Sequence, residues 1–120
     1  MPQSKGTWTM VYDQENNFSL TSIVDKEAKL VVITVGERLD FSAHQQFHEA
    51  YQKLPRGHEY KYIIDMAQTE FIDSAALGML LLLRETAGGD QSRIEINNCN
   101  QLIKNILRVA NFAKLFMVND

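Results

Sequence analysis

Hydrophobic residues in this sequence gather in short runs, separated by longer stretches in which apolar and polar residues are mixed. Four runs, residues 20–24, 30–35, 60–66 and 92–97, are rich in β-branched and aromatic side chains, which is typical of β-strands. Residues 30–35 are almost continuously apolar and predict a strand covered on both faces. Residues 92–97 alternate polar and apolar side chains and predict a strand with one exposed face. Residues 116–118 predict a last short strand.

The mixed stretches between these runs predict three helices. Ser42 and Gln45 match a capping box and predict that the first helix begins at Ser42. The apolar stripe of this helix consists of Phe47, Ala50, Tyr51 and Leu54. A second helix is predicted over residues 74–87, closed by two glycines, and a third over residues 101–110. The predicted core residues of the second helix are Leu77, Leu80, Leu81 and Leu83. Those of the third helix are Leu102, Ile103, Ile106 and Ala110.

The predicted order of elements is β-β-α-β-α-β-α-β, so the fold class is α/β with a mixed, mostly parallel sheet. The first two strands form a hairpin, and right-handed helical crossovers join the later strands. Residues 1–17 are polar and aperiodic, which predicts a loose extension before a single domain over residues 18–120. Functional sites in such sheets lie beyond the carboxyl ends of the strands. Three loops meet there: residues 36–41, 67–74 and 97–100.

Composition narrows the possible functions. The formal net charge is −3 and the basic residues are scattered, which argues against direct binding of nucleic acid. Cys99 is the only cysteine, so neither an intrachain disulfide nor a cysteine-based zinc site is expected. The N-terminus does not resemble a signal peptide, and the apolar runs are too short to cross a membrane. We therefore expect a cytoplasmic protein with no membrane insertion.

Asp73 and Ser74 stand side by side at the predicted start of the second helix, in one of the three loops. Both are favoured N-cap residues, so capping alone is the simplest explanation. Yet the pair offers more capping chemistry than one helix start requires. A helix N-terminus also stabilises an added phosphate, which makes Ser74 a candidate for phosphorylation. Gly78, four residues further on, costs ~1 kcal/mol relative to alanine inside a helix and predicts a packing reason.

Other chemistry is incomplete in this sequence. His44 and His48 have a spacing that can hold zinc, but no third ligand accompanies them. Ser74, His58 and Asp65 do not form a recognisable catalytic triad, because no G-x-S-x-G motif surrounds the serine. Asp65 ends a buried strand as a phosphoacceptor aspartate does, but the paired acids of a magnesium site are missing. We therefore predict no enzyme activity, no metal and no cofactor.

The segment YIIDMAQTEFIDSAALGMLLLLRE, residues 62–85, resembles the signature of the STAS domain of bacterial anti-sigma factor antagonists. In that family a buried strand ends in Asp, and after a loop the motif Asp-Ser-x-Gly-x-Gly opens an apolar helix. Asp65, the Asp73-Ser74 pair and Gly78 match this pattern, whereas Ala76 stands at the first glycine. The resemblance extends over residues 20–118. Because the sequence stops soon after the last predicted strand, we expect the C-terminal helix common in relatives to be short or absent.

The resemblance implies a switch based on Ser74. When this serine is unphosphorylated, a family member binds an anti-sigma factor, often itself a serine kinase, and frees a sigma factor. Phosphorylation breaks the complex, and a PP2C-type phosphatase restores it. The predicted partner-binding residues are Asp73, Ser74 and Ala75, with a rim of Gly36, Glu37, Asp40, Thr69, Asn98 and Asn100. Asp65 and Gly78 are predicted to support this site.

Two other functions stay open at this point. The chain is alternatively a non-switching STAS scaffold, or a subunit in a larger signalling or lipid-transport assembly, in which case Ser74 is only a cap. It is alternatively a small-molecule sensor that uses the loops around Asp65 and Cys99.

Overall fold

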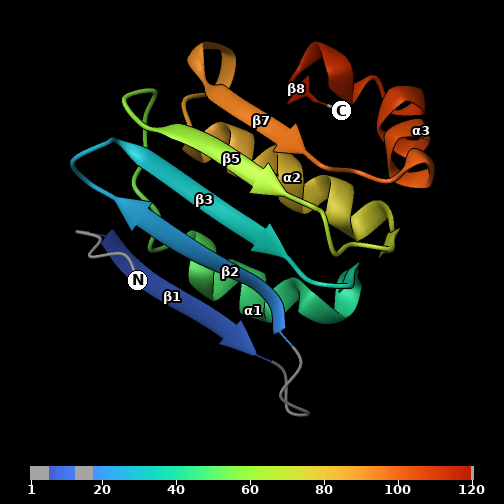
Figure 1. Cartoon of the computed structure of the whole chain (residues 1–120), viewed down its shortest axis with the longest axis horizontal. Coiled ribbons are helices and arrows are strands. Elements are labelled where there is room, and N and C mark those ends of the chain that lie inside the picture. The colour runs from blue at the N-terminus through green and yellow to red at the C-terminus, as the bar shows by residue number, and fades with distance from the viewer. Residues whose placement is uncertain (1–5, 13–17, 120) are drawn as a thin grey trace.

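The computed structural model describes residues 6–12 and 18–119, which form two layers (Figure 1). One layer is a six-stranded sheet with the strand order β1-β2-β3-β5-β7-β8. Its strands are β1 (Gly6–Tyr12), β2 (Phe18–Asp25), β3 (Leu30–Val35), β5 (Lys61–Asp65), β7 (Arg93–Asn97) and β8 (Met117–Val118). The first three strands pair in antiparallel fashion, and β3, β5, β7 and β8 are parallel.

Helices α1 (His44–Tyr51) and α2 (Ser74–Thr86) form the second layer, behind the sheet in the view of Figure 1. Helix α3 (Gln101–Val109) lies beyond the carboxyl end of β7. The 3-10 turns are η1 (Phe41–Ala43), η2 (Gly89–Gln91) and η3 (Phe112–Lys114). The predicted α/β class, with a mostly parallel sheet and a β2-β3 hairpin, is confirmed.

Both large helices pack on the same face of the sheet, because β3, β5 and β7 are consecutive neighbours and right-handed crossovers then return on one side. Buried and half-buried positions alternate along β3 as a result: Val31 and Ile33 are buried, and Val32 is half-buried. The prediction that residues 30–35 are covered on both faces is therefore wrong. No helix among the described residues covers the other face of the sheet (Figure 1).

The chain contains an edge strand that was not predicted. Residues Gly6–Tyr12 form β1 and pair with β2, so the prediction of a loose extension is wrong for this part of residues 1–17. Residues 1–5 and 13–17 lie outside the described residues. The sequence does contain a strand signal here, because Thr7 and Thr9 of the segment GTWTMVY alternate with larger apolar residues.

The start of the first helix differs from the prediction. Asp40, rather than Ser42, is the capping residue: its carboxylate accepts the Ser42 N–H at 3.1 Å, and η1 follows. The α-helix itself begins at His44 without a side-chain cap. The predicted capping box at Ser42 is therefore wrong. An aspartate two residues earlier provided a better acceptor, since its carboxylate is charged.

Two of the apolar helix faces are rotated relative to the predictions. In α3, Ile103 and Leu107 are fully buried, whereas Leu102 is 56% exposed. In α2, Leu80 and Leu83 are buried, but Leu81 is exposed, so it is not a core residue. Each helix buries only a narrow stripe of its side chains, which leaves some of its leucines at the surface.

Candidate functional site

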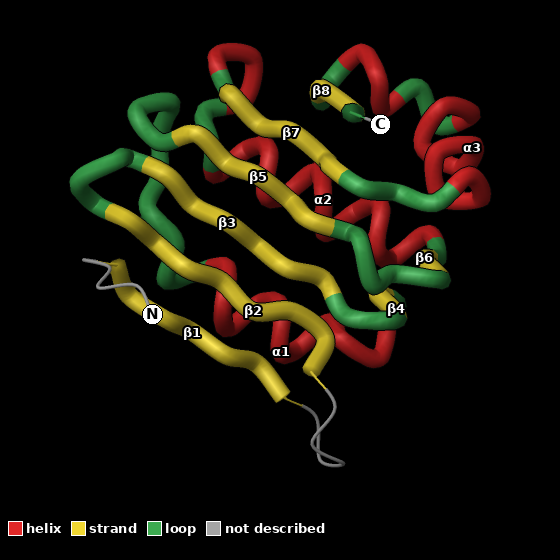
Figure 2. Tube along the Cα trace, viewed as in Figure 1, coloured by secondary structure: helices red, strands yellow, loops and turns green. Residues whose placement is uncertain are grey.

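The loops that precede α1 and α2 are joined by a second, two-stranded sheet (Figure 2). Strands β4 (Arg38–Leu39) and β6 (Phe71–Ile72) are parallel and in register. The Glu37 carbonyl also accepts the backbone N–H groups of Glu70, at 2.7 Å, and Phe71, at 3.2 Å. This small sheet was not predicted, because two-residue strands leave no periodic signal. It brings the start of α2 next to the start of η1.

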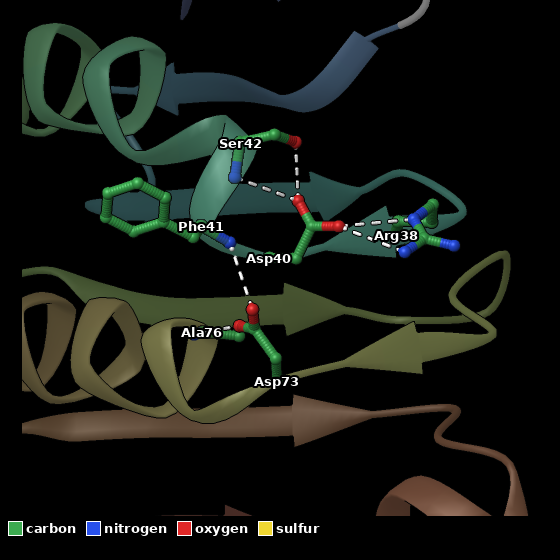
Figure 3. A network of polar contacts seen from close by, with 6 residues as sticks. All are labelled: Arg38, Asp40, Phe41, Ser42, Asp73 and Ala76. Carbon is green, nitrogen blue, oxygen red and sulfur yellow. Dashed lines mark hydrogen bonds and ion pairs between the residues drawn. The ribbon is translucent and has the colours of Figure 1, made fainter.

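Asp73 connects these two helix starts. One carboxylate oxygen accepts the Ala76 N–H at 3.0 Å and caps α2. The other accepts the Phe41 N–H at 3.1 Å, at the beginning of η1 (Figure 3). A single side chain thereby satisfies backbone donors from segments 32 residues apart. The role of Asp73 as a cap was foreseen, whereas its bond to Phe41 depends on tertiary structure.

Ser74 is the first residue of α2 and is exposed. Its hydroxyl makes no hydrogen bond to another of the described residues, since Asp73 supplies the cap. Capping therefore explains Asp73 but not Ser74. The hydroxyl lies at the positive end of a 13-residue helix. Ala75, which was also predicted to contact a partner, is half-buried beside it.

Asp40 forms a compact ionic cluster near Asp73, with Arg38 and Ser42 (Figure 3). Its carboxylate accepts both the Ser42 N–H and the Ser42 hydroxyl, and it binds two guanidinium nitrogens of Arg38 at 3.2 Å. The Ser42 hydroxyl first, and then Arg38, hold the pKa of Asp40 below its ordinary value despite partial desolvation. The guanidinium also stacks on Phe71, 4.8 Å from the ring centre. Asp40 therefore stays charged and orders the loop.

Two of the predicted rim residues are not at the surface. Thr69 is 2% exposed, and its hydroxyl donates to the Val35 carbonyl at 3.3 Å. Gly36 is buried as well. Both residues sit inside the loops that support the site, so the prediction that they contact a partner is wrong.

Other predicted residues hold the neighbouring loops in place. Asp65, at the end of β5, accepts the Ala67 N–H at 2.9 Å and the Asn98 side-chain amide at 3.0 Å. Asn100 caps α3 by accepting the Ile103 N–H at 2.8 Å. Glu37, Asn98 and Asn100 are exposed. They border the site, and their role in binding stays a prediction.

The outer face of α2 continues from Ser74 as an apolar surface. Gly78 is exposed one turn after Ser74, and a Cβ added there would meet nothing within 4 Å. A packing reason for Gly78 inside the domain is therefore wrong. The exposed large side chains of this region are Phe41, Phe71, Leu81 and Leu82, with exposed fractions of 69, 40, 39 and 38%. We call these six residues, Phe41, Phe71, Ser74, Gly78, Leu81 and Leu82, the Ser74 surface.

The candidate residues for other chemistry are arranged differently. Cys99 is buried against Met66, and desolvation by burial raises the pKa of its thiol to about 11. His44 and His48 stack with ring centres 6.3 Å apart. Within the described ranges, no three histidine, cysteine or acidic side chains gather as metal ligands. None of the helices in that part of the chain is both long and apolar enough to span a bilayer.

Comparisons with known proteins show what this chain is similar to. The family model described as "Mlab, STAS domain" matches residues 22–119. STAS-domain containing protein PA14_20770 of Pseudomonas aeruginosa (strain UCBPP-PA14) is 36% identical over 104 residues, which cover 84% of this chain and 99% of that protein. The solved structure of the anti-sigma factor antagonist SpoIIAA in its unphosphorylated form aligns with a TM-score of 0.50 and 20% identity. That alignment covers 68% of this chain and 74% of SpoIIAA, and the likeness concerns the fold.

Proposed function

This chain belongs to the STAS-domain family, and we propose that it is an anti-sigma factor antagonist whose binding is switched by phosphorylation of Ser74. The observation that carries the proposal is the state of Ser74, which is exposed, without a hydrogen-bond partner among the described residues, and at the start of α2. The fold shared with an anti-sigma factor antagonist also supports it.

The unphosphorylated form offers an apolar surface to its partner. Phe41 and Phe71 stand on the two loops that β4 and β6 join, and Leu81 and Leu82 stand on α2. Burying exposed aromatic and leucine side chains is the usual source of binding energy at the centre of an interface. Gly78 lets the backbone of a partner approach α2 closely, because no side chain covers this turn.

A phosphate on Ser74 would change this surface from apolar to strongly anionic. It adds a charge of about −1.5 to −2 beside the carboxylate of Asp73. Arg38, on the strand that pairs with β6, is already engaged by Asp40. In a packed interface the phosphate must be desolvated or repelled. A cost of even 2–3 kcal/mol would weaken binding by ~30–150-fold.

The proposed partner is an anti-sigma factor or serine kinase, which acts on Ser74, and a PP2C-type phosphatase returns the protein to its binding state. The protein itself contributes no catalytic group. Its basic residues are scattered rather than clustered for nucleic acid, so the proposed action on transcription passes through its partner. The proposed location of this action is the cytoplasm.

Affinity capture with matched variants tests the proposal. Wild type, Ser74→Ala and Ser74→Asp are used as baits in a lysate of the native cells, and the captured proteins are quantified by mass spectrometry. The control is Gln91→Asp, which adds the same charge to an exposed position in η2, at the other end of α2. We expect Ser74→Ala and the control to capture the anti-sigma factor or kinase, and Ser74→Asp to lose it. Equal capture by all four baits overturns the switch and favours a non-switching scaffold.

A further inference from the structure

A groove of about 690 Å³ lies far from Ser74, between the start of β7 and the turn that leads into β8. It borders the face of the sheet that carries no helix, because Lys61, Arg93 and Glu95 alternate with the buried residues of β5 and β7. The other wall consists of η3 and β8, including Lys114, Leu115 and Met117. In Figure 1, β8 lies beside β7 at the edge of the sheet. The size lies within the range of pockets for small ligands, ~300–1,000 Å³.

The charges around this groove leave an excess of two cations. Glu95, the one acidic side chain among the described lining residues, is already bound by the Lys61 ammonium at 2.8 Å and by the Asn119 amide at 3.0 Å. Arg93 donates to the backbone carbonyls of residues 58 and 59, which fixes its guanidinium without neutralising it. Lys114 forms no ion pair with a described residue. Arg93 and Lys114 therefore raise the local concentration of anions in the groove, although the whole chain has a formal charge of −3.

The same groove also has an apolar side. Met117 is 60% exposed and Leu115 is 37% exposed, and both line it. Large apolar side chains are normally exposed singly. Here two of them line the same groove as Lys61 and Arg93 of β5 and β7. A ligand that satisfies both walls must combine an anionic head with an apolar tail.

We propose that this groove binds a small amphiphilic anion that is free in solution, with one carboxylate or phosphate head and a short apolar tail. Arg93 and Lys114 hold the head, and Leu115 and Met117 cover the tail. The volume accommodates roughly twenty non-hydrogen atoms, at the ~30 Å³ that a water molecule occupies. The proposal does not depend on the Ser74 switch, and it places a ligand away from the loops around Asp65 and Cys99.

Titrations followed by ¹H–¹⁵N spectra test the inference with the full chain. The probes are octanoate and octyl phosphate, which share a tail and differ in the head, octanol, which lacks the charge, and acetate and inorganic phosphate, which lack the tail. We expect at least one of the two charged amphiphiles to shift the backbone amides of residues 92–95 and 113–118. The tighter of the two identifies the head group. The affinities of the other three probes are expected to be lower by a factor of at least about ten.

Matched variants locate the site. Lys114→Gln is expected to weaken binding of the charged amphiphile by about two- to fivefold, because it removes one partly exposed cation. Met117→Ser is expected to weaken it by a similar or larger factor through loss of the apolar wall. Lys53→Gln and Leu102→Ser, at exposed positions outside the groove, are expected to leave it unchanged.

Three outcomes would overturn the proposal. The first is octanol binding as tightly as octanoate and octyl phosphate. The second is amide shifts centred on the Ser74 surface instead of the groove. The third is no binding of either charged amphiphile at millimolar concentration. Association instead with vesicles of anionic lipid, added as a further probe, would indicate a membrane surface as the ligand.

Discussion

Replacing Gly78 by alanine is expected to stabilise the domain while weakening its proposed interface. Glycine in the interior of a helix costs ~1 kcal/mol relative to alanine, because the flexible backbone loses more entropy on folding. A close neighbour of the glycine would offset part of this gain, because the added methyl group would be overpacked. Here the added Cβ meets nothing within 4 Å, so no steric cost opposes the gain.

The expected magnitude is an increase of about 0.5–1 kcal/mol in the free energy of unfolding. For a chain of this length, this corresponds to a rise of roughly 2–5 °C in Tm. Gly88→Ala is the matched contrast. Gly88 has a φ of +120°, and a Cβ there would lie 3.0 Å from the His58 Cβ and 3.1 Å from its backbone. That variant is expected to be destabilised by more than ~1 kcal/mol.

Urea unfolding followed by circular dichroism measures both variants against wild type. If Gly78→Ala leaves the stability unchanged or lowers it, the reasoning from the open turn is refuted. A second measurement uses the partner captured by Ser74→Ala. Reduced affinity of the more stable Gly78→Ala protein would show that the glycine serves the interface rather than the fold.

Three further results are expected from the site. Asp73→Ala should lower the free energy of unfolding by about 1–2 kcal/mol, since it removes the α2 cap and a second backbone acceptor; a loss well below ~0.5 kcal/mol in urea unfolding would contradict this role. The depressed pKa of Asp40 contributes stability that is complete above about pH 4 and is lost as the pH falls through the lower folded value. Acid titration of Asp40→Asn should therefore show a shallower loss than wild type, and identical slopes would refute the assignment. Cys99, with a raised pKa of about 11, should react slowly with Ellman's reagent at pH 8 in the native protein and rapidly after unfolding; fast native labelling would contradict its burial.

The main elements of the fold were predictable because each leaves a periodic signal of its own. The runs at residues 30–35 and 60–66 are strands with bounds within a residue of those expected, and α2 begins at Ser74 as predicted. Periodicity, however, does not report how many faces of a strand are covered. Residues 30–35 were expected to be buried on both faces, and the shared side of the two helices makes this untrue.

The candidate site was predictable only in part. The N-cap position of Asp73 followed from local chemistry, since aspartate is a favoured cap. The contact between Asp73 and Phe41, and the pairing of β4 with β6, join segments more than 30 residues apart and depend on tertiary packing. Burial of Thr69 has the same origin, because its partner is the Val35 carbonyl at the end of β3.

The most direct test of the proposed switch is the phosphorylation state of Ser74 in the native cells. The protein is isolated after rapid lysis in denaturant, so that phosphatases stop acting, and is measured by intact mass and peptide mapping across growth conditions. A strain carrying Ser74→Ala serves as the control. The account predicts a single phosphoryl group on the peptide that contains Ser74, varying with conditions and absent from the control. A protein that is unmodified at Ser74 under every condition, or phosphorylated only elsewhere, would contradict it.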